Sequence, residues 1–195
     1  MNKALLAVGI IGSFALASAL PSRAAGEAPE TSPHHGLAAG QRGPSGELVR
    51  IVKEATARFH DVEVAKREGY ALMFGCVSGD AHGAMGLHYV NLGLVGDPAL
   101  DPRRPEIVIY EPRPNGGLRL IGADYLVFKA DWDAGHPGEP PQIMGQLLHL
   151  FESPNRFGLP DFYTLHVWAW KGNPTGTFVN WHADVSCEAF SGQAP

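Results

Sequence analysis

The stretch EIVIYEPRPNGGLRLIGADYLVF, residues 106–128, decides the fold predicted for this chain. Its two ends are apolar and rich in β-branched and aromatic residues, the composition that favours β-strands. Asn115-Gly116-Gly117 lies between them and suits the left-handed backbone of a tight turn. We therefore predict an antiparallel hairpin whose strands cover residues 106–111 and 118–128.

Further strands are predicted on both sides of this hairpin. FYTLHVWAWK, residues 162–171, is the strongest of them, because aromatic and β-branched residues dominate it. Few of the connections are long enough for helical crossovers, so the sheet should be mainly antiparallel. The other predicted strands cover residues 70–74, 85–90 and 177–181, and residues 142–151 read as a short helix or an irregular apolar segment.

One amphipathic helix is predicted before the strands, over residues 46–69. Its apolar side chains recur at steps of three and four, which places them on one helix face. Ser45 is a suitable N-cap and Gly69 a suitable stop. The predicted fold class is α+β, with this helix packed on a curved sheet or partial barrel in a single domain, residues 46–195.

The first 25 residues have the pattern of a secretory signal peptide. Lys3 precedes an apolar run over residues 4–20, and small residues follow at Ser22, Ala24 and Ala25. The apolar run is close to the shortest that spans a membrane, so a retained anchor is the alternative. Residues 26–45, rich in Gly, Pro and Ser, read as a flexible linker. The prediction is export to the periplasm or the extracellular medium, free of the membrane after cleavage.

The charge balance excludes some classes of partner. Residues 26–195 hold 13 basic and 20 acidic side chains, because the predicted signal peptide contains two basic residues and no acidic one. A net-acidic domain without a Lys/Arg cluster is a poor ligand for nucleic acid. The same balance disfavours docking on anionic lipid.

Cys76 and Cys187 are the two cysteines of the chain. In an exported protein, two distant cysteines are most simply read as one disulfide. That bond would close a loop of about 110 residues, which stabilises a fold by restricting its unfolded state. The alternative is a reactive thiol or a metal thiolate, although the pair lacks C-x-x-C spacing.

Several histidines and carboxylates interrupt apolar segments. His88, His149 and His166 are such residues, together with Glu111 or Glu106 at the ends of one predicted strand. A buried polar group needs a hydrogen-bond partner, a charge partner or a metal. We therefore predict that the histidines and Glu111 converge on a divalent ion such as Zn, Cu, Fe or Mn. No compact metal motif supports this convergence, and separate structural histidines remain the alternative.

Two other features suggest a ligand pocket. Trp168 and Trp170 alternate with His166 along the predicted strand, so the three side chains should share a face and could wall a small-molecule site. Core packing of both rings is the alternative. Arg103-Arg104 could clamp a carboxylate or phosphate, or could instead form ion pairs with nearby acids.

Three segments resemble a group of uncharacterised small exported bacterial proteins. They are GAMGLHYVN (residues 83–91), LDPRRPEIVIYEP (residues 100–112) and PNRFGLPDFYTLHVWAWKGNPTGTFVNWHADVSC (residues 154–187). The resemblance implies export and a single domain, and it implies no activity.

The leading hypothesis is an exported protein that binds a small molecule or a metal in a pocket lined by histidine and tryptophan. One alternative is a metal-dependent enzyme with the three histidines as ligands and Glu111 as ligand or general base. The other is a structural or interaction module of the cell envelope that has no such site.

Overall fold

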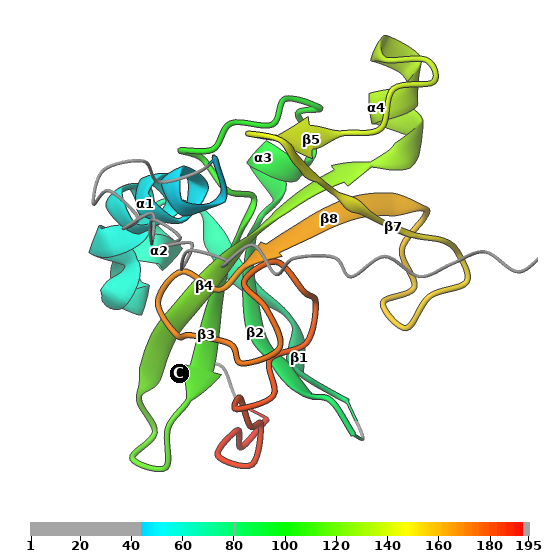
Figure 1. Cartoon of the computed structure of the whole chain (residues 1–195). Helices are drawn as coiled ribbons and strands as arrows, with labels where there is room; N and C mark the ends of the chain where they lie inside the picture. Colours follow the sequence, from blue (N-terminus) through cyan, green and yellow to red (C-terminus); the bar gives the residue numbers. More distant parts are fainter. Residues whose placement is uncertain (1–43, 80, 193–195) are drawn as a thin grey trace, which may run out of the picture. The chain divides into compact units, whose positions relative to one another are not determined.

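Six strands form one antiparallel sheet in the computed structural model, which describes residues 44–79 and 81–192 (Figure 1). Their spatial order is β1-β2-β3-β4-β8-β7. The predicted signal peptide, residues 1–25, and the linker up to residue 43 lie outside the described residues. The strands are β1 (Tyr70–Gly79), β2 (Gly83–Asn91), β3 (Ile107–Pro112), β4 (Leu118–Phe128), β7 (His149–Phe151) and β8 (Phe162–Val167).

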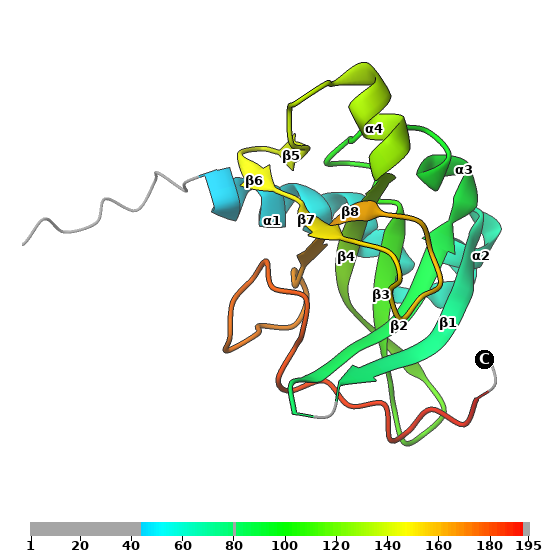
Figure 2. The ribbon, with the colours of Figure 1, turned by 90° about the vertical axis from the view of Figure 1, so that its right-hand side faces the viewer.

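The predicted hairpin of residues 106–128 is confirmed as the pair β3–β4 at the centre of the sheet. Ile107 lies opposite Asp124, and Pro112 lies opposite Leu118 next to the turn. Register shifts interrupt the β1–β2 and β3–β4 ladders. Because such bulges bend strands and increase their twist, the sheet curls into a half-barrel (Figure 2). The predicted α+β class is therefore confirmed.

The predicted helix of residues 46–69 is split into three pieces that pack against the outer face of the sheet. They are α1 (Pro44–Thr56), the 3₁₀ helix η1 (Ala57–His60) and α2 (Val62–Arg67). The break occurs because Asp61 has extended backbone and its carboxylate accepts the Glu63 N–H, which starts α2 as a separate helix. A φ of +93° at Gly69 then directs the chain into β1.

Two predicted segments differ from the structure. Residues 142–151 form three short strands, β5 (Gln142–Ile143), β6 (Gln146–Leu147) and β7, of which β7 joins the edge of the main sheet. Residues 177–181, predicted as a strand, form turns, and only His182 makes an isolated bridge, to Ala84. The remaining helices, α3 (Leu92–Val95) and α4 (Lys129–Gly135), lie in connections between strands.

The two faces of the sheet have different covers. The outer face packs Tyr89, Tyr110 and Tyr125 towards the N-terminal helices. The inner face is covered by the loop of residues 152–161 and by the segment that follows β8, which contribute Phe157 and Trp168. The predicted disulfide is confirmed: Cys76 of β1 is bonded to Cys187, 111 residues later, and ties the C-terminal segment to the sheet.

None of the helices in the described part of the chain is long and apolar enough to cross a membrane.

Candidate metal centre

Three strands place one ionisable side chain each on the inner face of the sheet. His88 of β2 lies opposite Ile109 of β3. Two residues from Ile109, on the same face of β3, Ile107 lies opposite Asp124 of β4. Asp124 in turn lies opposite His166 of β8. Because paired residues project to the same face of a sheet, this register brings His88, Asp124 and His166 together.

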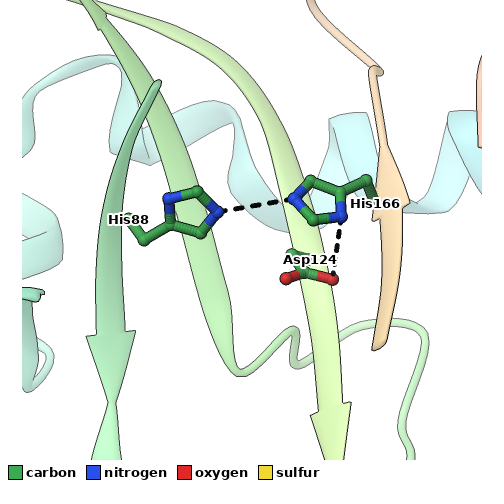
Figure 3. Close-up of side chains that lie close together, drawn as sticks. All are labelled: His88, Asp124 and His166. Carbon is green, nitrogen blue, oxygen red and sulfur yellow. Dashed lines mark hydrogen bonds and ion pairs between the residues drawn. The ribbon is translucent and has the colours of Figure 1, made fainter. Parts of the chain in front are cut away.

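The donor atoms of these three side chains converge (Figure 3). His88 Nε2 lies 3.4 Å from His166 Nε2, and His166 Nδ1 lies 3.7 Å from Asp124 Oδ1. One ligand atom from each side chain lies within 4.8 Å of the other two. Two nitrogens bound to one tetrahedral metal ion at 2.0–2.1 Å are about 3.4 Å apart, so the histidine pair already has the required spacing. The Asp124 carboxylate lies closest to the other nitrogen of His166, Nδ1, on the opposite edge of that ring.

Glycines allow the strands to approach closely beside this group. Gly86 precedes His88 by two residues and has a φ of +85°, and a Cβ there would lie 2.6 Å from the Tyr110 carbonyl oxygen. Gly122 precedes Asp124 by two residues, and a Cβ there would lie 2.5 Å from the Val167 carbonyl oxygen. A larger residue at either position would push apart the strands that carry the three donors.

All three side chains are buried, but their hydrogen bonding is incomplete. Their exposed fractions are 6% for His88, 2% for Asp124 and 3% for His166. The Thr164 hydroxyl donates to Asp124 Oδ1 at 2.5 Å. The Nδ1 atoms of both histidines have no hydrogen-bond partner among the described residues. The two Nε2 atoms are hydrogen-bonded to each other, so the polar atoms of the cluster are satisfied in part by the described residues.

Burial determines the charge of each group. It lowers the pKa of His88 to about 4, with a further contribution from His166, and lowers the pKa of His166 to about 3. Burial raises the pKa of Asp124 to about 6, opposed by His88 and by the Thr164 hydrogen bond. At neutral pH the cluster therefore contains two neutral imidazoles, the form that binds metals, and a buried carboxylate for which the described residues offer no lysine or arginine partner.

A cavity of about 30 Å³ adjoins the three donors. His88, Asp124, His166 and Thr164 are among the residues that line it, although the surface they expose to the cavity is apolar. The rest of the wall is apolar and comprises Phe74, Met85, Leu126, Phe151, Phe157, Leu159 and Phe162. An ion held by the donors would therefore face a small, mainly apolar space.

The structure does not bring His149 or Glu111 into this group. His149 lies at the edge of the sheet on β7, where its side chain is exposed and its Nδ1 lies 3.3 Å from Asn180 Oδ1. Glu111 lies at the far end of β3 and accepts a hydrogen bond from Lys171 Nζ at 2.6 Å. The carboxylate of Glu106 is buried and accepts the Leu126 N–H, and burial raises its pKa to about 8.

Asp124 was not among the residues predicted from sequence. It interrupts the apolar strand LRLIGADYLVF in the same way that His88 and His166 interrupt theirs. The criterion that selected the histidines, an ionisable residue embedded in an apolar strand, would have selected Asp124 as well.

The two tryptophans lie on different sides of the sheet. The Trp168 ring is buried 5.5 Å from the His166 ring, and its Nε1 donates to the Val179 carbonyl. Trp170 instead donates to Thr56 Oγ1 of α1. The prediction of a shared face is wrong because β8 ends at Val167, after which the strand alternation no longer applies.

Arg103 and Arg104 are exposed, and they are not among the described residues that line the cavity beside the His/Asp/His group. Arg103 Nη1 lies 4.0 Å from Glu54 Oε2, a weak surface ion pair. The Arg104 backbone N–H donates to the Asp101 carbonyl within the same loop.

Comparisons of this chain with protein-family models, with curated proteins and with solved structures find no match. The described residues form an α+β half-barrel with a buried His/Asp/His group of the kind that could hold a metal ion.

Proposed function

We propose that this protein binds one divalent transition-metal ion through His88, Asp124 and His166. The observation that carries the proposal is the meeting of three buried donors from three strands within 4.8 Å of one another. Strands of a packed sheet hold their side chains more rigidly than loops do, which favours a defined coordination geometry.

The donor set indicates the kind of ion. Two imidazoles and one carboxylate suit Zn, Cu, Fe or Mn, whereas Ca and Mg prefer oxygen ligands alone. Three protein ligands leave at least one coordination position open, unlike a structural zinc site with four. A cavity of about 30 Å³ lies beside the three side chains, and a further small ligand of the ion would have to fit there.

The electrostatics of the cluster support the same function. A divalent ion would neutralise the buried Asp124 carboxylate and would replace the hydrogen bond between the Nε2 atoms of His88 and His166. The Thr164 hydroxyl would keep the carboxylate oriented, as hydrogen bonds from neighbouring residues commonly do for metal ligands.

The disulfide indicates a non-reducing compartment. We include export in the proposal, because the leader-like pattern of residues 1–25 agrees with such a compartment. The protein would then acquire its ion in the periplasm or the extracellular medium.

A metal titration tests the proposed function. Protein freed of metal with a chelator should bind one equivalent of Zn(II) or Co(II) per chain, and Co(II) should develop the visible absorption bands of a site with nitrogen and oxygen ligands. Calorimetry and elemental analysis after desalting give the stoichiometry. Protein that retains no Zn(II), Co(II), Cu(II), Mn(II) or Fe(II) would show that the cluster is not a metal site.

A further inference from the structure

The half-barrel has a seam that backbone hydrogen bonds do not close. β1 and β7 are the two edge strands of the main sheet. The loop of residues 152–161, which follows β7, reaches across to β1 (Figure 2). There Arg156 donates to the Ser78 carbonyl at 2.9 Å, and the Phe157 ring contacts the Phe74 ring with centroids 5.5 Å apart. Side-chain contacts therefore join the loop of residues 152–161 to β1 across this seam.

Phe74 connects the solvent with the cavity beside the metal ligands. Its exposed fraction is 47%, yet it also lines the cavity. It lies in the β1 bulge between Met73 and Cys76, with a φ of +64°. A left-handed backbone is unfavourable for a bulky residue, and such strained residues are concentrated at functional sites. The bulge thus places an aromatic ring at the mouth of the cavity at an energetic cost.

The loop that carries Phe157 is held by its own hydrogen bonds. Asn155 Oδ1 accepts the N–H groups of Phe157 and Leu159, and the Asn155 amide donates to the Leu159 carbonyl. Because this backbone is tied down, the Phe74 and Phe157 side chains are the parts of the seam that are freest to move. Rotamer changes of exposed side chains are fast, on the picosecond to nanosecond scale.

The size and lining of the cavity determine what can enter. A cavity of about 30 Å³ holds roughly two water molecules. Beyond the donors and Thr164, its walls are phenylalanine, leucine and methionine. A charged molecule entering this space would lose its hydration without compensation from the walls. A small uncharged molecule is weakly hydrated, so it loses little hydration free energy when it enters.

We propose that the seam between Phe74 and Phe157 admits a small uncharged ligand, of two or three non-hydrogen atoms, to the open coordination position of the metal. This inference rests on the proposed metal site, and it adds the class of molecule that the site takes and the route by which it enters. Dioxygen and nitric oxide have the required size and lack of charge.

Nitric oxide binding to the Fe(II)-loaded protein under anaerobic conditions tests the ligand class. Nitric oxide should bind and change the visible absorption and the electron paramagnetic resonance spectrum, whereas millimolar imidazole, a larger ligand, should leave both unchanged. Azide, small but charged, should bind much more slowly than nitric oxide. Wild-type protein that binds imidazole as readily as nitric oxide, or that holds Fe(II) but does not bind nitric oxide, would overturn the proposal.

Widening the seam tests the route. Phe74→Ala should accelerate nitric oxide binding about tenfold, equivalent to about 1.4 kcal/mol off the barrier, and should allow imidazole to bind. Phe157→Ala is a second variant with the same expected effect, should the first be poorly folded. Leu150→Ala is the matched control, because Leu150 is an exposed apolar residue of β7 that does not line the cavity. Equal rates in wild type, Phe74→Ala and Phe157→Ala would contradict the route.

Xenon separates failure of the seam from failure of the metal site. Xenon binds apolar cavities without needing an ion, so the metal-free protein should shift the ¹²⁹Xe resonance, and Phe74→Ala should speed xenon exchange. Protein that binds no metal but takes up xenon in this way would refute only the proposed function. Protein that binds metal but shows neither xenon uptake nor a variant effect would refute the seam and leave the metal site intact.

Discussion

Replacing His166 by alanine should lower the affinity of the protein for Zn(II) by more than 100-fold. Loss of a residue that merely supports a metal ligand typically costs about 10–100-fold, and His166 is proposed as a ligand itself. The Nε2 atom of His166 lies 3.4 Å from that of His88, and its Nδ1 atom lies 3.7 Å from Asp124, so His166 lies between the other two proposed ligands (Figure 3). Competition with a chromophoric chelator measures the change.

His149→Ala is the matched control for this prediction. It removes the same side chain from the neighbouring strand β7, where the imidazole is exposed and faces Asn180. Because His149 acts on His166 and Asp124 only through its charge, its loss should change the Zn(II) affinity far less than the loss of His166. Comparable losses in the two variants would mean that the measured binding is surface binding by histidine, and that the buried cluster is not the site.

Removal of the disulfide should produce the largest loss of stability. The double variant Cys76→Ser/Cys187→Ser should lower the free energy of unfolding by about 2–5 kcal/mol, because the bond closes a loop between residues 111 positions apart. The bond also ties the C-terminal segment, which covers part of the inner face, to β1. Loss of it should therefore loosen the cover over the metal ligands as well.

Urea unfolding followed by tryptophan fluorescence measures this change. Wild-type protein with a reductant should unfold at the same urea concentration as the double variant, because both lack the bond. An unchanged unfolding midpoint in the double variant would contradict the prediction, because it would show that the disulfide does not stabilise the fold by restricting the unfolded chain.

The elements that the sequence predicts well are those with local signals. The hairpin of residues 106–128 combines two apolar strands with Asn-Gly-Gly, and each part of that signal lies within a few residues of the next. The disulfide was predictable because the chain offers one possible pair. The break of the N-terminal helix was not predicted, because the helical spacing of apolar residues continues across Asp61. That spacing gives no indication that Asp61 is the N-cap of a second helix.

The site was predicted only in part, because a site depends on which strands become neighbours. His88 and His166 were selected as polar residues in apolar strands, and the structure places them together. The distance of Glu111 from them follows from the β3 register and from its pairing with Lys171, neither of which is visible in the sequence. Trp168 and Trp170 lie on different sides of the sheet because β8 ends at Val167. The aromatic residues continue past Val167, so the sequence does not indicate where the strand ends.

Anomalous diffraction from a crystal of the Zn(II)-loaded protein tests the metal site most directly. With data collected on both sides of the zinc absorption edge, one peak should appear about 2.0–2.2 Å from a nitrogen of His88, a nitrogen of His166 and an oxygen of Asp124. A zinc peak confined to surface residues such as His149, with the three buried side chains free of metal, would contradict the account.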